Sequence, residues 1–246
     1  MTKIVLFADG LVGQRIATYL VSSFPNDVAF VVTTIRNEIS ASCDSAGIEN
    51  FVFESETATI ANIKRSNVDF GMLAWWPKII RQELISVAKQ GFVNTHPSLL
   101  PHNRGKHYNF WAIVERAPFG VTLHKVTEEV DAGDIIAQKA IAYDWTDTGG
   151  TLYVKAQEAM VALFVEAYPA IRRGDVVAIR QQLCEGSFHR ASELDAASRI
   201  DLDELYSARD LLNRLRARTF SGYPACWFED DGARYEVRLD IERKLK

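Results

Sequence analysis

The chain has 246 residues, of which 48% are hydrophobic and 24% are charged. This is ordinary globular composition, which excludes collagen, long coiled coils and intrinsic disorder, and the length suggests one large domain with a smaller one. A net charge of −4 disfavours general nucleic-acid binding, which draws on concentrated positive charge. No apolar stretch approaches the ~20 residues of a membrane helix. The three cysteines form no CxxC pair, so we expect reduced thiols in a cytoplasmic protein.

Short apolar runs and helical patterns alternate over the first hundred residues. The runs are Ile4–Phe7, Val28–Val32, Asn50–Phe53, Phe70–Ala74 and Gly91–Asn94, and one of the helical patterns is Ile79–Ala88. This alternation predicts a parallel sheet with helices on both faces. The first turn, Asp9–Gly13, holds one Gly-x-x-Gly rather than a three-glycine fingerprint, and no Lys-Ser/Thr follows it. It therefore predicts a tight strand-to-helix turn rather than a dinucleotide site.

The pattern changes after residue 105. Two strands are predicted at Gly120–His124 and Ile135–Ile141, and a long helix at Leu152–Ile171 that ends before Gly174. The last sixty residues indicate a separate unit, with a helix capped by Ser207 and a β-hairpin turning at Asp230–Gly232. We therefore predict an α/β fold, with a Rossmann-like parallel-sheet domain over 1–182 and a C-terminal helix and β-hairpin unit over 183–246.

Polar side chains suited to catalysis follow the fifth predicted strand. Asn94 and His96 are spaced i, i+2, so both side chains point the same way if the strand conformation persists. Ligands bind at this carboxyl edge of parallel sheets, where an amide can stabilise an oxyanion and an imidazole can transfer a proton. Asp131, in a glycine turn before a later strand, could orient the imidazole. From the residue types alone, the commoner alternative is that Asn94 and His96 only cap a loop.

An ordered set of motifs over residues 91–138 resembles the formyltransferases that use 10-formyltetrahydrofolate. The set is Asn94-x-His96-x-Ser98-Leu-Leu-Pro101-x-x-Arg104-Gly105, Trp111-Ala112-Ile113, Gly120-Val121-Thr122-x-His124 and Asp131-x-Gly133-x-Ile135. The resemblance implies a catalytic triad of Asn94, His96 and Asp131. It also implies that 10-formyltetrahydrofolate, as cosubstrate, contacts Met72, Leu73, Ala74, Asp131 and Ile135. For Met72, core packing is the alternative.

The C-terminal part is similar to one branch of that family, the sugar-nucleotide N-formyltransferases. The similarity lies in Leu215–Pro224 with the hairpin after it, and in Gly105–Trp111. It implies formylation of the amino group of a nucleoside-diphosphate-linked amino-dideoxysugar, usually dTDP-linked, for surface glycans such as O-antigen. It further implies a homodimer formed through the C-terminal unit. Residues 187–246 hold 11 basic and 12 acidic residues, which argues against a tRNA acceptor.

Several alternatives stay open. The acceptor could be an aminoacyl-tRNA or an amino-sugar lipid precursor, or the chain could be a non-catalytic binder of folate or nucleotide sugar. In the transfer, Asn94 would stabilise the oxyanion, and either His96 or Asp131 would accept the amine proton.

The nucleotide sugar is expected to contact residues from four segments: Trp76, Lys78, Arg104, Tyr108, Asn109 and Tyr223. We expect Lys78 in the first turn of a helix begun by Pro77, where backbone N–H groups attract a pyrophosphate. For Trp76 and Lys78, core packing and solvation are the alternatives. Tyr223 lies in a Gly-Tyr-Pro turn and could stack on the base.

No metal is expected, because the histidines have no ligand spacing and no cysteine partner. His124 lies within a predicted strand and is interpreted as structural.

Overall fold

The computed structural model describes residues 2–244. The chain divides into two compact units. The first comprises the residues up to His96, Thr122–Gln138 and Gln157–Gln181, and the second comprises Pro97–Val121, Lys139–Ala156 and the chain from Gln182 onward. Both units are therefore assembled from segments that are far apart in the sequence.

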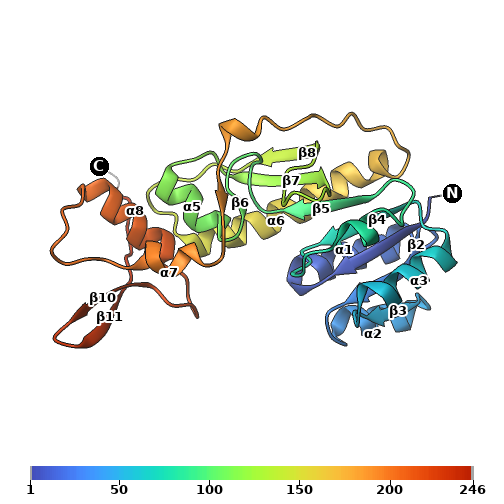
Figure 1. The fold of residues 1–246 in the computed structure, drawn as a ribbon, viewed down its shortest axis with the longest axis horizontal. Helices are drawn as coiled ribbons and strands as arrows, with labels where there is room; N and C mark the ends of the chain where they lie inside the picture. Colours follow the sequence, from blue (N-terminus) through green and yellow to red (C-terminus); the bar gives the residue numbers. More distant parts are fainter. Residues whose placement is uncertain (1, 245–246) are drawn as a thin grey trace. The chain divides into compact units, whose positions relative to one another are not determined.

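A seven-stranded sheet in the order β3-β2-β1-β4-β5-β7-β8 organises the first unit (Figure 1). Its strands are β1 (Ile4–Ala8), β2 (Val28–Thr33), β3 (Asn50–Val52), β4 (Phe70–Ala74), β5 (Phe92–His96), β7 (Gly120–Lys125) and β8 (Ile135–Ala140). The first five strands pair in parallel, as predicted. Strand β7 pairs with β5 in the antiparallel direction, which places Asn94 opposite His124.

The sheet is therefore mixed: β1 to β5 form the predicted parallel part, and β7 runs antiparallel to β5. A parallel β7 would need a crossover connection along a face of the sheet. Residues 97–121, which follow β5, belong instead to the second unit. The predicted α/β class is confirmed.

Helices of the first unit pack in two groups. They are α1 (Gly10–Ser23), α2 (Glu38–Ala46), α3 (Glu56–Ser66), α4 (Gln82–Ile85) and the C-terminal part of α6 (Gly149–Ile171). Helix α1 packs with α2, and α3 packs with α4. Every residue of β1 is buried, so both faces of the sheet are covered there. The predicted tight strand-to-helix turn is confirmed, since β1 ends at Ala8 and α1 begins at Gly10.

Helix α4 is much shorter than the pattern Ile79–Ala88 predicts. Arg81 has an extended backbone (φ −95°, ψ 167°) and caps the helix, which begins at Gln82. Its backbone N–H donates to the Glu56 carboxylate at 2.8 Å. Lys78 precedes the helix by four residues. The expectation that Lys78 lies in the first turn of a helix begun by Pro77 is therefore wrong.

The second unit contains short elements around two packed helices, α5 and α8. Its elements are β6 (Arg104–Gly105), α5 (Tyr108–Glu115), a 3₁₀ turn (Leu183–Glu185), β9 (Phe188–His189), α7 (Glu193–Ser198), α8 (Ala208–Arg218), β10 (Cys226–Asp230) and β11 (Ala233–Val237). The predicted cap is confirmed, since Ser207 Oγ accepts from the Asp210 N–H at 3.1 Å. The hairpin is also confirmed, with Asp231 and Gly232 at positive φ in its two-residue turn. Within residues 2–244, no helix has both the length and the apolar character to span a membrane.

Candidate active site

The first unit brings Asn94 and His96 together with Asp131. Asp131 lies 35 residues after His96 in the sequence. Asn94 and His96 lie on β5, and Asp131 lies in the β7–β8 connection. His96 Nδ1 is 3.3 Å from Asp131 Oδ2, and Asn94 Nδ2 donates to Asp131 Oδ1 at 3.5 Å. Because His96 is only 4% exposed, these polar groups meet where solvent screens them weakly.

A second histidine completes the cluster. His124 Nε2 lies 3.2 Å from Asn94 Nδ2 and 3.5 Å from Asp131 Oδ1. His124 Nδ1 lies 2.8 Å from the carbonyl oxygen of Lys125, which can only accept, so Nδ1 carries a proton. In the neutral ring Nε2 then accepts from the Asn94 amide, and His124 fixes the direction in which that amide points.

Electrostatics keep the Asp131 carboxylate ionised. Burial by itself would raise the pKa of Asp131, but the neighbouring His96 and His124 outweigh it. Together they hold the pKa of Asp131 well below its ordinary value. A carboxylate with so low a pKa is a weak base, and it is better suited to orienting an imidazole than to accepting a proton.

Two residues fix the loop that carries Asp131. The buried Gln181 side chain donates from Nε2 to the carbonyl oxygens of Asp131 at 2.9 Å and Gly133 at 2.6 Å. A Cβ on Gly133 would lie 1.9 Å from the Lys125 carbonyl oxygen, so only glycine allows this close approach to β7. Asp131 itself has φ +52°, a left-handed conformation that aspartate tolerates better than most residues. The position of the carboxylate therefore depends on Gln181.

Replacing Gln181 with Glu is expected to lower kcat about tenfold or more, because a carboxylate of the same shape cannot donate to the two carbonyl oxygens. The measurement is kcat at saturating substrates for the formyl transfer that the sequence resemblance implies, with circular dichroism to check folding. Gln182→Glu, next in the sequence, supplies the matched control. Wild-type kcat in a folded Gln181→Glu variant would show that the loop holds its conformation without this side chain.

The residues expected to contact folate divide between the core and the β7–β8 connection. Met72, Leu73 and Ala74 are buried in β4, where Leu73 pairs with Asn94. Thr95 Oγ1 donates to the Leu73 carbonyl oxygen and accepts from the Trp75 N–H, which ties the ends of β4 and β5 together. Ile135 follows Asp131 at the start of β8 and is half-buried. Their contact with folate stays a prediction.

The two predicted substrate residues after β4 differ in environment. The Trp76 ring packs edge-on against Phe7 and Phe53, with centroids 5.2 and 5.5 Å away. Its indole N–H is buried without a hydrogen-bond partner among residues 2–244. The Lys78 ammonium lies 4.8 Å from the centroid of the Phe53 ring. Trp76 is thus part of an aromatic cluster, and Lys78 lies at its margin.

The other predicted substrate residues belong to the second unit. Arg104 is buried in β6, which pairs with β9. Asn109 donates to the Gly149 carbonyl oxygen at 2.7 Å. Burial raises the pKa of Tyr108 well above its ordinary value, and the nearby Tyr153 and Tyr223 add to this. Tyr223 itself is 55% exposed, and its ring centroid lies 4.5 Å from that of Phe220.

Two residues that contact the cluster, His124 and Gln181, are not part of the site predicted from the sequence. His124 is interpreted there as structural, because a parallel sheet gives no reason to place it beside Asn94. The antiparallel pairing of β7 with β5 is the missing information. Gln181 carries no sequence signal, since an isolated glutamine after a helix has no characteristic spacing. Among residues 2–244, no group of three or more His, Cys, Asp or Glu side chains is arranged to hold a metal ion.

Two protein-family models match this chain. The family model described as formyl transferase matches residues 14–168, and a model described as the N-formyltransferase dimerization C-terminal domain matches residues 193–243. A dTDP-4-amino-4,6-dideoxyglucose formyltransferase of Mycobacterium tuberculosis is 33% identical over 151 residues. The matched segment covers 61% of this chain and 64% of that protein, so it spans slightly less than two thirds of the curated relative.

Solved structures extend the similarity over the whole fold. A Mycobacterium tuberculosis protein regarded as a sugar N-formyltransferase has a TM-score of 0.84 and 25% identity, covering 100% of both chains. An N-formyltransferase of Helicobacter canadensis, solved with folinic acid and dTDP-3-aminofucose, has a TM-score of 0.72. At 16% identity, over 94% of this chain and 85% of that one, it shows the shared fold alone. Because the first model covers more than half of the chain and includes the whole cluster from Asn94 to Asp131, the chain belongs to the formyl transferase family.

Proposed function

We propose that this protein transfers the formyl group of 10-formyltetrahydrofolate to the amino group of a dTDP-linked amino-dideoxysugar. The observation that carries the proposal is the cluster of Asn94, His96 and Asp131 in a formyl transferase fold. Two similarities favour the sugar nucleotide as acceptor: the curated relative acts on dTDP-4-amino-4,6-dideoxyglucose, and the Helicobacter canadensis structure holds a folate and a dTDP-amino sugar. The formylated product would serve surface glycans such as O-antigen.

The geometry favours His96 over Asp131 as the proton acceptor. Asp131, ionised and facing His96 Nδ1, holds the proton of the neutral ring on that nitrogen and leaves Nε2 to take the amine proton. Asn94 stabilises the oxyanion, a role commonly worth about 3 kcal/mol. Its Nδ2 now contacts His124 and Asp131, so an oxyanion would replace the longer of the two contacts.

The remaining assignments complete the proposal. The folate contacts are Met72, Leu73, Ala74 and Ile135, and the substrate contacts are Trp76, Lys78, Arg104, Tyr108, Asn109 and Tyr223. Residues 1–182 form the catalytic part and 183–246 the dimerising part, a boundary supported by the two matched models. The three cysteines form no disulfide, which supports a cytoplasmic location.

The test is incubation of the protein with 10-formyltetrahydrofolate and a panel of nucleotide-linked amino sugars, read by mass spectrometry. The expected result is a mass increase of one formyl group on a dTDP-linked amino-dideoxysugar. Formylation of an aminoacyl-tRNA or of an amino-sugar lipid precursor, in its place, would identify a different acceptor. Binding of folate and nucleotide sugar without transfer would show a non-catalytic binding protein.

Replacing Tyr223 with Ala is expected to raise KM for the sugar nucleotide about tenfold, because base stacking is worth ~1–3 kcal/mol in nucleic-acid-binding proteins. KM for the folate should stay nearly unchanged. Tyr223→Phe is the matched control, since it keeps the aromatic ring and removes only the hydroxyl, so KM should stay near the wild-type value. Equal effects on both KM values, or none, would remove Tyr223 from the nucleotide site.

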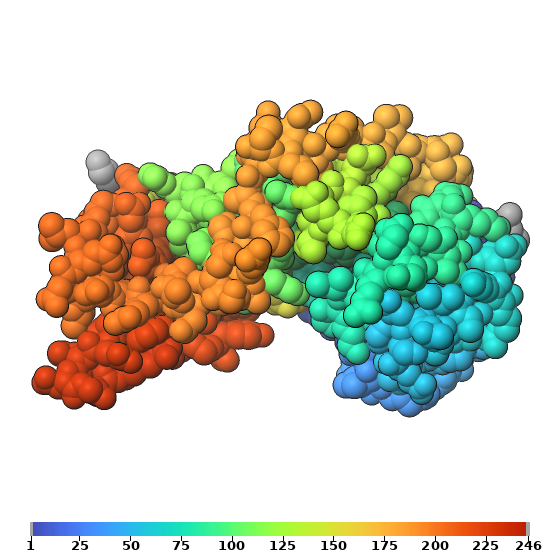
Figure 2. Space-filling model, viewed as in Figure 1, coloured from blue at the N-terminus to red at the C-terminus, as the bar shows by residue number. Residues whose placement is uncertain are grey.

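We also expect a homodimer at micromolar concentration. The matched C-terminal model describes a dimerization domain. Strand β10 packs on α8, whereas β11 is exposed from Ala233 to Glu236. The rings of Phe228 and Tyr235 stack across the two strands of this hairpin, drawn in red in Figure 2, and exposed aromatic surface of this kind favours a partner. Sedimentation equilibrium measures the mass directly. A value equal to one chain would contradict the dimer.

A further inference from the structure

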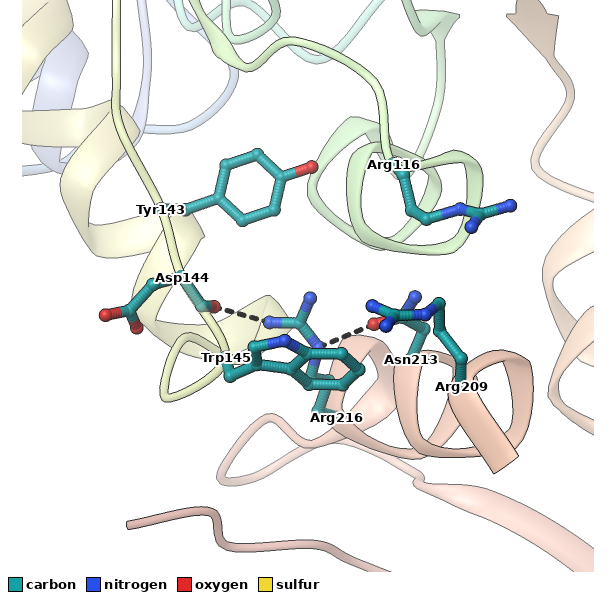
Figure 3. A pocket seen from close by; sticks show the side chains of 7 residues that line it. All are labelled: Arg116, Tyr143, Asp144, Trp145, Arg209, Asn213 and Arg216. Atoms are coloured by element: carbon teal, nitrogen blue, oxygen red, sulfur yellow. Dashed lines mark hydrogen bonds between the residues drawn. The ribbon is translucent and has the colours of Figure 1, made fainter. Parts of the chain in front are cut away.

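A cavity of about 290 Å³ opens on α8 in the second unit (Figure 3). Three parts of the chain line it: the residue after α5, the segment after β8, and α8. In that order they supply Arg116; Tyr143, Asp144 and Trp145; and Arg209, Asn213 and Arg216. It shares no residue with the predicted folate or sugar-nucleotide contacts. Its volume is close to the lower end of the range for small-molecule sites, about 300–1,000 Å³.

Three of the lining residues are arginines without a carboxylate partner. Throughout residues 2–244, the ion pairs made by arginines leave out Arg116, Arg209 and Arg216. Three positive charges and one carboxylate, that of Asp144, therefore line the cavity, and none of the three arginines forms an ion pair among residues 2–244. Unpaired positive charge on a concave surface concentrates anions from solution.

Arg216 forms the buried floor of the cavity. It is 5% exposed, and its Nε donates to Asn213 Oδ1 at 2.9 Å. Its Nη1 donates to the carbonyl oxygens of Asp144 at 2.6 Å and Asp147 at 2.9 Å. All three acceptors are neutral, so they orient the guanidinium without cancelling its charge. Burial lowers the pKa of Arg216, and an anion beside it would stabilise the charged form.

Of the two acidic side chains that act on Arg216, Asp147 is paired with Lys155 and Asp144 is turned away. The Asp144 carboxylate accepts from the N–H and the hydroxyl of Thr146 at 2.9 and 2.7 Å, and Figure 3 shows it pointing away from the guanidiniums. The Trp145 ring lies among the cations instead, with Arg216 and Arg209 Cζ at 4.9 and 5.3 Å from its centroid. These cation–π contacts hold both arginines at the cavity.

We propose that this cavity binds the diphosphate group of a small molecule, either as free pyrophosphate or as part of a nucleoside diphosphate. Guanidinium groups match phosphate oxygens in pairs, and three arginines match the charge of a diphosphate better than that of a single carboxylate. The site is separate from the Asn94 cluster, so the proposal does not depend on formyl transfer.

The experiment follows the fluorine resonance of Trp145 in protein labelled with 5-fluorotryptophan. The signal is assigned by its loss in Trp145→Phe, and the protein is titrated with pyrophosphate, with dTDP and with citrate. We expect a saturable shift with pyrophosphate and dTDP, and a much weaker one with citrate. Stronger binding of dTDP than of pyrophosphate would identify the nucleoside diphosphate as the ligand, and equal binding would identify the diphosphate alone.

Matched variants decide whether the cavity is the site. In Arg116→Gln with Arg209→Gln, two exposed positions, the affinity should fall about tenfold or more. Arg15→Gln, an exposed arginine on α1, removes a charge elsewhere and should leave the affinity unchanged. The proposal is overturned if the Trp145 signal does not shift at millimolar pyrophosphate, if the double variant retains the affinity, or if citrate binds as well as pyrophosphate. Because no step of this test measures formylation, a failed formylation assay would leave it intact.

Discussion

Replacing His96 or Asp131 with Ala is expected to reduce kcat about a hundredfold or more while the protein stays folded. Nδ1 of His96 faces the Asp131 carboxylate, so Nε2 is the nitrogen that we propose accepts the proton. Without Asp131, the imidazole loses the partner that fixes its proton on Nδ1. Both losses act on the transition state more than on substrate binding, so KM should change much less than kcat.

The measurement is kcat for formyl transfer by mass spectrometry, with circular dichroism and thermal melting as checks on folding. His102→Ala is a suitable control, since His102 lies six residues further along the chain and outside the cluster. Asp131→Asn separates shape from charge, and it should be nearly as slow as Asp131→Ala if the ionised carboxylate is what matters. Wild-type turnover in any folded variant would remove that residue from the mechanism.

The largest effect on stability is expected at Asp27, where alanine should lower the free energy of unfolding by about 3 kcal/mol. Asp27 is 2% exposed and precedes β2. It accepts from Arg172 Nε and Nη2 at 2.6 and 2.9 Å and from the Tyr168 hydroxyl at 3.0 Å. The alanine variant leaves an arginine and a buried tyrosine hydroxyl without their acceptor, and that is what makes such a loss costly.

Urea denaturation measures the free energy of unfolding of the wild type and of Asp27→Ala. Tyr168→Phe is a second, milder variant of the same network. That variant removes one neutral hydrogen bond and keeps the ion pair, so it should cost only about 1 kcal/mol. A loss of less than 1 kcal/mol of unfolding free energy in Asp27→Ala would mean that water replaces the network.

Burial by itself would raise the pKa of Asp27, but Arg172 and Tyr168 outweigh it and lower the pKa. The contribution is therefore complete above the unfolded pKa, about 3.9, and is lost as the pH falls through the lower folded value.

Local patterns in the sequence predict most of the elements. The five apolar runs from Ile4 to Asn94 became five parallel strands, and the Ser207 cap and the Asp230–Gly232 turn are where their residue types place them. Each of these features depends on neighbours within a few residues, so the sequence alone contains the information.

Features that depend on distant residues were not predictable in the same way. The direction of β7 depends on the path of residues 97–121. The N-terminus of α4 has a contact just as distant, since the N–H of Arg81 donates to Glu56, 25 residues earlier. The contacts of His124 and Gln181 follow from the same long-range geometry. Asn94, His96 and Asp131 could be named together only because the order of several motifs resembles a known family.

The central place of β1 in the sheet has a consequence for synthesis of the chain. β1 pairs with β2 on one side and with β4 on the other, and β4 is made about forty residues after β2. At about 5–20 residues per second, one edge of β1 therefore waits several seconds for its partner. That edge presents unpaired backbone N–H and C=O groups on a strand whose five side chains are all apolar, so it is open to pairing with other chains. The protein is thus most prone to aggregate while still nascent, before any residue of the active-site cluster has left the ribosome.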